Sequence, residues 1–464
     1  MFFRGDLVQC PALGQLDILP DYLLEVDDSG FLTHVSPANS PESCKKLDSS
    51  SISLTIIPPG SFLLPTFCDL HLHAPQSLYH GTGLHRPLME WLDEYAFKAE
   101  ERLDADPILA RRVYKCLAER LIENGTGAVS LFGTIKEETN LILAEVMQAA
   151  GLRAFVGKLS MDISSRPSYV EASAQESLSA VESFVKNCHA LVSHLPEHKR
   201  LVEPVITPRF VPSCSDDLLA GLGAMSEAKS LRIQSHLAEA HDQIEWVKRE
   251  RGVDDIEIFD RHALLTPRTI QAHCTFVDSQ SLSLLRTRGT AIAHCPLSNA
   301  YFSAKPFPLH EALQTVKVGL GTDVAGGYSL DIMSAMRQSV VVSRMREGSR
   351  IMHGTEGGCQ HSETCESLSV DWKESLYLAT RSGALALNLP RGCGLFTVGS
   401  PFDVQYIRVF DAETNLGVGA LDFFDAVLSG KSPGLSPEMV EKWWSLGDVR
   451  NRAGVWVQGI KLTG

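Results

Sequence analysis

Apolar, strand-like runs alternate with amphipathic stretches through the middle of the chain. The runs expected to be strands are 61–73, 126–134, 152–160, 201–209, 231–237, 269–275, 290–295 and 317–322. A helix is expected at 105–123. Its apolar positions recur at helical spacing, at Leu109, Val113, Leu117 and Leu121. Strands joined by helices in this number predict an α/β fold, a (β/α)8 barrel, whose active site lies at the carboxyl ends of the strands.

Short strand-like runs also lie at both ends of the chain. They are 21–26, 30–35 and 54–57 near the amino end, and 399–407 and 455–460 near the carboxyl end. Two small β segments on either side of a long middle predict one composite β-sandwich domain that both chain ends form. We therefore expect residues 1–60 and 393–464 to make up this domain, and residues 61–392 to make up the barrel.

Residues able to bind a metal ion occur where the expected strands end. The first strand ends in His71-Leu72-His73, and both imidazoles point to one face because side chains alternate along a strand. Alone, this pair would be read as an ordinary strand end, but His236 ends the fifth strand and Asp323 follows the eighth. Three imidazoles and a carboxylate suit zinc, with iron as an alternative, and water completes the ligand shell.

Charge and composition exclude several classes of partner. The chain has 42 basic and 56 acidic residues, and its net charge of −14 argues against nucleic acid or an anionic membrane as a partner. No run of about 18 apolar residues is present, and the first ten residues lack the apolar core of a signal peptide. The 11 cysteines have no paired spacing, so we expect reduced thiols in a cytoplasmic protein.

The order His-x-His, His, His and Asp on strands one, five, six and eight resembles the amidohydrolase superfamily. Three further blocks resemble its guanine-specific branch: 87–92 (PLMEWL), 208–210 (PRF) and 319–329 (GLGTDVAGGYS). The resemblance implies zinc-dependent hydrolysis of guanine to xanthine and ammonia by a homodimer, with guanine and water as the small-molecule partners. It also implies that Gln76 and Arg209 recognise the edge of the purine and that Phe210 packs on its ring.

Residues beside the expected metal ligands suit the acid–base steps of such a reaction. Zinc lowers the pKa of bound water to about 7 and so supplies hydroxide near neutral pH. Deamination also needs a proton for the ring nitrogen and another for the departing ammonia. We expect Glu239 to protonate the ring nitrogen, and Asp323 to bind the metal, accept the proton of the water and pass it on. His273, off the metal, is expected to orient the hydroxide and the tetrahedral intermediate by hydrogen bonding.

Metal count and the polar stretch at 345–369 leave alternatives open. Binuclear members of the superfamily carry a bridging lysine on strand four, where this chain has Arg209, so we expect one metal ion per chain. Lys158, at the end of strand three, is an alternative candidate for a bridging lysine. The polar stretch contains His353, Cys359, His361 and Cys365. Their spacing is not typical of a zinc site, so a mobile surface insertion is favoured.

Two other functions also stay open. One is an aminohydrolase of the same superfamily that acts on adenine-type, triazine or pyrimidine rings. The other is a catalytically lapsed barrel that serves in assembly, against which the intact ligand set and Glu239 speak. The choice between guanine and another ring depends on Gln76, Arg209 and Phe210.

Overall fold

A computed structural model describes residues 1–48, 53–356, 367–411, 414, 416–423 and 434–462. In the middle of the chain, parallel strands lie in the sheet in their order along the sequence, from β6 to β13. They are β6 (Phe67–His73), β7 (Thr126–Phe132), β8 (Arg153–Ser160), β9 (Val202–Pro208), β10 (Arg232–Leu237), β11 (Thr269–His273), β12 (Ala291–His294) and β13 (Val318–Leu320). Each lies within a run that the sequence predicted, and the α/β barrel is confirmed.

The first and last barrel strands meet at their carboxyl ends. The backbone N–H of Asp323 donates to the carbonyl of His71 at 2.8 Å. The buried carboxylate of Asp69 on β6 accepts from the backbone N–H and the hydroxyl of Thr322, at 3.0 and 2.5 Å. These bonds close the barrel, and they bring side chains from the two ends of the sheet to one opening.

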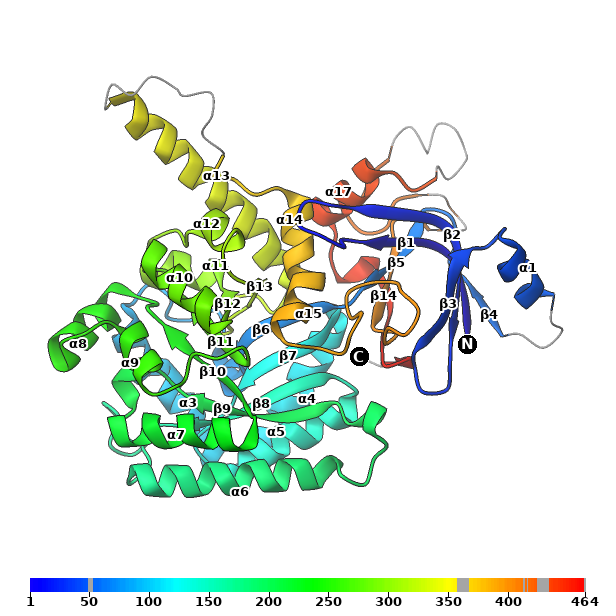
Figure 1. Cartoon of the computed structure of the whole chain (residues 1–464). Helices are drawn as coiled ribbons and strands as arrows, with labels where there is room; N and C mark the ends of the chain where they lie inside the picture. Colours follow the sequence, from blue (N-terminus) through cyan, green and yellow to red (C-terminus); the bar gives the residue numbers. More distant parts are fainter. Residues whose placement is uncertain (49–52, 357–366, 412–413, 415, 424–433, 463–464) are drawn as a thin grey trace.

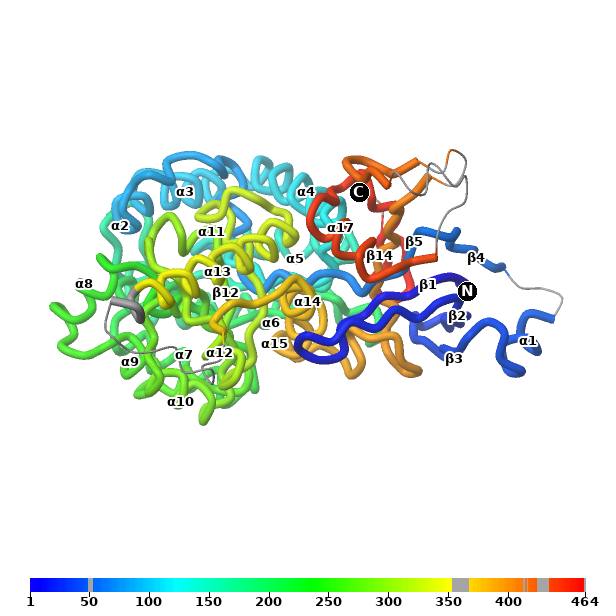
Figure 2. Tube along the Cα trace, turned by 90° about the horizontal axis from the view of Figure 1, so that it is seen from above, coloured from blue at the N-terminus to red at the C-terminus, as the bar shows by residue number. Residues whose placement is uncertain are grey.

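Helices cover the outside of the barrel (Figures 1 and 2). Those that follow β6 are α2 (Leu88–Trp91), α3 (Phe97–Ala105) and α4 (Pro107–Glu123). Those of the later connections are α5 (Glu137–Ala150), α6 (Ala174–Val192), α7 (Asp216–Lys229), α8 (His241–Arg251), α9 (Asp255–Arg261), α10 (Ser279–Arg288), α11 (Pro296–Ser298), α12 (Leu309–Leu313), α13 (Ile332–Glu356), α14 (Trp372–Tyr377) and α15 (Gly383–Ala386). Short 3-10 and π-helical turns also occur between these elements. Ala74–Tyr79 is a 3-10 turn directly after β6, and Leu92–Ala96 is a π turn that joins α2 to α3.

Helix α4 shows why these segments are helical. The side chain of Asp106 accepts from the first backbone N–H groups of the helix, and Pro107 fits its first turn. Tyr114, Leu117 and Leu121 share the buried face at helical spacing. Burying a large apolar side chain of this kind stabilises the fold by about 1.5–3 kcal/mol.

The two chain ends form one mixed sheet beside the barrel (Figure 1), in the order β16-β15-β14-β5-β1-β2-β3, with β4 paired to β1. Its strands are β1 (Phe2–Gln9), β2 (Asp17–Val26), β3 (Leu32–Pro37), β4 (Leu54–Ile56), β5 (Ser61–Pro65), β14 (Val404–Arg408), β15 (Arg452–Val457) and β16 (Ile460–Lys461), with helices α1 (Pro41–Leu47) and α17 (Pro437–Leu446). Antiparallel pairing of β14 with β5 joins the ends. The composite domain is thus confirmed, and the residue limits of the three parts stay a prediction.

Two stretches differ from the expectation. The run 61–73 is two strands, β5 in the mixed sheet and β6 in the barrel. Both are buried throughout, so the apolar pattern alone shows no break. The stretch 345–369 begins as helix, because α13 continues to Glu356, so an irregular insertion is wrong for that part. Residues 357–366, with three of the four candidate zinc ligands there, lie outside the described residues. No helix in the described part of the chain is long and apolar enough to cross a membrane.

Candidate active site

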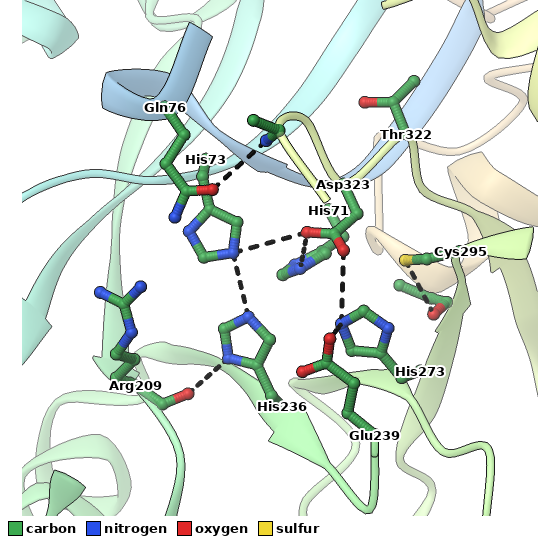
Figure 3. A network of polar contacts seen from close by, with 12 residues as sticks. His71, His73, Gln76, Arg209, His236, Glu239, His273, Cys295, Thr322 and Asp323 are labelled. Carbon is green, nitrogen blue, oxygen red and sulfur yellow. Dashed lines mark hydrogen bonds and ion pairs between the residues drawn. The ribbon is translucent and has the colours of Figure 1, made fainter. Parts of the chain in front are cut away.

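A pocket opens at the carboxyl ends of the barrel strands. The space in it that protein atoms leave empty, open solvent included, is about 340 Å³. Most of the residues that the sequence predicted for the site line it: His73, Gln76, Arg209, Phe210, His236, Glu239 and Asp323. His71 and His273 lie against this set, deeper in the barrel (Figure 3). The strand-end rule therefore brings together every predicted site residue.

Three buried histidines converge in this pocket. The ring nitrogens of His71, His73 and His236 lie within 4.8 Å of one another, and the Nε2 atoms of His73 and His236 are 3.0 Å apart. Asp323 Oδ1 lies 2.9 Å from Nε2 of His71 and 3.5 Å from Nε2 of His73. The shorter contact lacks hydrogen-bond geometry, because His71 Nε2 has no hydrogen-bond partner. Ligand atoms this close together fit groups that share a cation.

The imidazoles are in the form that binds a metal. Burial lowers the pKa of His73 and of His236 well below the usual value, so both rings are neutral at pH 7. His236 Nδ1 lies 2.5 Å from the carbonyl oxygen of Arg209, which can only accept. Nδ1 therefore carries the hydrogen, and the lone pair of Nε2 faces the other ligands. These residues fit a divalent metal ion.

Two carboxyl groups in the pocket have pKa values shifted in opposite directions. Burial, with the charge of Asp323 as the second cause, raises the pKa of Glu239 well above the usual value. Burial alone would raise the pKa of Asp323 as well, but the opposing effects of His71 and His273 are larger together and lower that pKa. One carboxyl is thus set to hold a proton and the other to be ionised, as an acid and a base in one site must be.

His273 lies between these two carboxyl groups. Its Nε2 is 3.6 Å from Glu239 Oε1 and 3.7 Å from Asp323 Oδ2. Its Nδ1 is 2.9 Å from Asn299 Oδ1, and burial lowers the pKa of the ring to about 4. The ring is therefore neutral, and with Nδ1 donating to Asn299 its free Nε2 can accept a hydrogen bond from water. His273 does not belong to the three-histidine cluster, although it shares a second cluster with the two carboxyl groups.

Glu100 on α3 joins the two polar residues expected at the purine edge, and the sequence did not single it out. Its carboxylate accepts from Arg209 Nη1 at 2.6 Å and from Gln76 Nε2 at 3.0 Å. Burial alone would lower the pKa of the Arg209 guanidinium, but the nearby Glu100 carboxylate has the larger effect and raises that pKa. A signal was present, because Ala96, Glu100 and Leu103 share one face at helical spacing, and a carboxylate on an apolar face needs a partner.

Asp255 at the start of α9 fixes the turn that carries Glu239, and it too was not expected. Ala238 has φ +47, a left-handed conformation that is uncommon outside glycine. The carboxylate of Asp255 accepts a hydrogen bond from the backbone N–H of Ala238 at 3.1 Å and another from Gln243 Nε2 at 2.6 Å. Burial raises the pKa of Asp255 to about 6. The strained turn aims Glu239 into the pocket three residues after His236.

Apolar side chains form the remaining wall. Leu88 and Trp91 of α2 line the pocket, together with Leu92, Phe210 and Phe302. The rings of Trp91 and Phe302 are 5.1 Å apart, and the indole N–H of Trp91 donates to the carbonyl of Thr82 at 3.2 Å. A planar heterocycle would meet apolar walls with few polar groups, as small-molecule pockets usually offer.

Two further residues of the barrel strands, Lys158 and His294, are engaged away from the three-histidine cluster. Lys158 Nζ is 2.5 Å from Glu171 and 2.9 Å from the carbonyl of Leu159. His294 stacks on Phe307 with ring centroids 4.9 Å apart. Among the described residues, His294 belongs to no cluster of histidines, cysteines and carboxylates that could hold a metal ion.

Comparison with known proteins gives one consistent result. A sequence model of the amidohydrolase family matches residues 62–459. Guanine deaminase of Dictyostelium discoideum is 34% identical over 474 residues, covering 99% of this chain and 97% of that protein, and human guanine deaminase is 33% identical over 465 residues, covering 99% and 96%. The solved structure of guanine deaminase from C. acetobutylicum, with guanine in its active site, has a TM-score of 0.83 and 27% identity, covering 100% of this chain and 99% of that one. The resemblance found in the sequence motifs is confirmed.

Proposed function

The chain belongs to the amidohydrolase family, and on this premise we propose that it hydrolyses guanine to xanthine and ammonia. One observation carries the choice of ring: a buried arginine and a glutamine, joined by Glu100, line the pocket beside the metal-binding cluster. Arginine has donors only. Guanine offers a 6-oxo acceptor to such a group, whereas adenine offers a 6-amino donor.

We propose that His71, His73, His236 and Asp323 hold one zinc ion per chain, since three imidazoles and a carboxylate are a typical set for zinc. Bound zinc supplies a water molecule with a pKa near 7 as the nucleophile. The involvement of Lys158 in an ion pair with Glu171 supports a single metal. Metal analysis of purified protein distinguishes zinc from iron.

The residues of the chain account for the proton movements. Guanine has a double bond between C2 and N3, so attack by water at C2 places an electron pair on N3. Glu239, which holds a proton in its buried position, donates that proton to N3. Asp323 accepts a proton from the attacking water and delivers it to the amino group on C2, which leaves as ammonia. As that C–N bond breaks, the hydroxyl on C2 becomes the carbonyl of xanthine and its proton passes to Glu239, which restores the carboxyl group. His273 orients the water by accepting a hydrogen bond at Nε2.

The pocket binds the base by complementary groups. Arg209 donates to the 6-oxo oxygen, Gln76 binds beside it, and Phe210 packs on the ring. We further propose that the enzyme is a cytoplasmic homodimer. Free thiols at all nine described cysteines support the compartment. The dimer is what the family resemblance of the motifs implies, and sedimentation of the purified protein tests it.

A panel of amino-heterocycles tests the function. Zinc-loaded protein is incubated with guanine, adenine, cytosine and an amino-triazine, and ammonia release is measured for each. We expect turnover of guanine and essentially none of adenine or cytosine, because a buried donor left unpaired rejects the wrong ring by roughly 10⁴-fold. Turnover of another ring in place of guanine would show a different aminohydrolase. No turnover of any ring by fully metallated protein would show a lapsed barrel.

A further inference from the structure

Glu100 is a buried carboxylate that contacts both polar residues of the proposed purine edge, Gln76 and Arg209, which Figure 3 shows. Each of its two oxygens accepts one hydrogen bond, Oε2 from Arg209 and Oε1 from Gln76. Its exposed fraction is 0%, so water does not compete for these bonds. A buried carboxylate with this choice of partners needs a reason beyond packing, because burying a charge is costly unless it is paired.

We propose that Glu100 is a positioning and specificity residue: it holds Gln76 and Arg209 in register for the purine and cancels the charge of Arg209, so that the pocket prefers a neutral base to an anion. This inference rests on the proposed deamination of guanine and adds a residue to it.

The hydrogen bonds define which atoms the substrate can meet. Gln76 Nε2 donates to Glu100, and Gln76 Oε1 accepts from the backbone N–H of Ala325 at 3.3 Å, so the amide is oriented at both ends. Arg209 gives Nη1 to Glu100 and lies over the ring of Phe97 at 4.8 Å. Its buried Nη2 has no hydrogen-bond partner. That nitrogen is the donor left for the 6-oxo oxygen.

The charge balance has a chemical consequence. Guanine binds as a neutral molecule, whereas xanthine is a stronger acid and forms an anion more readily. A lone buried guanidinium would hold that anion strongly. With Glu100 paired to it, Arg209 still donates a directed hydrogen bond but presents little net charge. The arrangement therefore favours the substrate over the ionised product.

Glu100→Gln tests the proposal, with Glu101→Gln as the matched control. Glu101 is the next residue on α3, and it pairs with Arg166 at the surface. For Glu100→Gln we expect KM for guanine to rise about 10²-fold, kcat to change by less than about 10-fold, and zinc content to stay at the wild-type level. The inhibition constant of xanthine, divided by KM for guanine, should fall, and more so at higher pH. Glu101→Gln should match wild type in all of these.

A double variant keeps the test valid if Glu100→Gln does not fold. Glu100→Gln combined with Arg209→Met leaves no unpaired charge. If Glu100 acts through Arg209, KM for guanine in the double variant should lie within about 3-fold of that in Arg209→Met alone. A further 10²-fold rise would overturn the proposal, as would a folded Glu100→Gln protein with wild-type KM. The wild-type assay decides the proposed function separately, because it depends on neither variant.

Discussion

Replacing Glu239 by glutamine separates chemistry from metal binding. The substitution keeps the size of the side chain and leaves the three-histidine cluster intact, but it removes the carboxyl proton. Glu239 is 4% exposed, and its Oε1 lies 3.6 Å from His273 Nε2. In this position no bulk water can replace the lost proton donor.

The expected size of the effect follows from general acid catalysis. A positioned acid contributes about 10²–10⁴-fold to the rate, which corresponds to about 2.7–5.5 kcal/mol of transition-state stabilisation. Burial raises the pKa of Glu239 and so favours the protonated form that acts as the acid, and the substitution removes this contribution. We therefore expect kcat for guanine to fall at least about 10²-fold, with KM little changed.

The assay follows the loss of guanine absorbance at saturating substrate, with zinc measured in the same preparations. The matched control is Glu245→Gln, which removes an exposed carboxylate of α8 that pairs only with His241 among its described ion-pair partners. We expect that control to keep kcat and zinc content. More than a tenth of wild-type kcat in metallated Glu239→Gln would refute the proposed role of Glu239.

Three further predictions concern metal, specificity and stability. Purified wild-type protein should hold close to one zinc per chain, and two tightly held metals would contradict the single site. His236→Ala should lose metal and activity together. Arg209→Met should lower kcat/KM for guanine at least about 10²-fold with zinc still bound, and wild-type kinetics in that variant would contradict its role. The pKa of Asp255 is about 6 in the folded protein against 3.8 without burial, so its stabilising contribution is full below pH 3.8 and lost as the pH rises through 6. This amounts to about 3 kcal/mol at 1.36 kcal/mol per pH unit. The free energy of unfolding, measured for metal-free wild type and Asp255→Asn, should therefore fall for wild type relative to the variant as the pH rises across this range.

The barrel was predictable because its signals are local. Each barrel strand is a short apolar run, and each run ends in residues that a parallel sheet places at one edge. The exceptions follow from the same cause. Ser61–Pro65 and Phe67–His73 are both buried on every residue, so the pattern does not show that the chain leaves one sheet and enters another. Strand β1 (Phe2–Gln9) was not expected at all, because four of its residues are only partly buried and Arg4 and Asp6 interrupt its apolar pattern.

The site was predictable where chemistry follows the strand ends, and not where it depends on packing between distant segments. His236 and Asp323 could be found from their positions after strands. Glu100 lies on a helix between the first two barrel strands, and its partner Arg209 is 109 residues further along the chain. Only the fold shows that they meet. Asp255 is similar, since its bond to Ala238 joins a helix start to a loop residue whose left-handed conformation no local pattern announces.

Barrel closure brings together the residues that we propose as metal ligands. His71 lies on the first barrel strand, and Asp323 follows the last. The backbone bond between them and the bonds of Asp69 to Thr322 form only when those strands meet. A metal ion held by ligands from both strands therefore binds the closed barrel and not the open chain, so its binding free energy adds to the stability of closure. The proposed purine edge is built from side chains outside the three-histidine cluster, Arg209 after β9 and Glu100 on α3. The bond of Arg209 to His236 comes from its backbone carbonyl, which a side-chain substitution leaves in place. This separation explains why substitutions at Glu100 or Arg209 should change recognition while the metal stays bound.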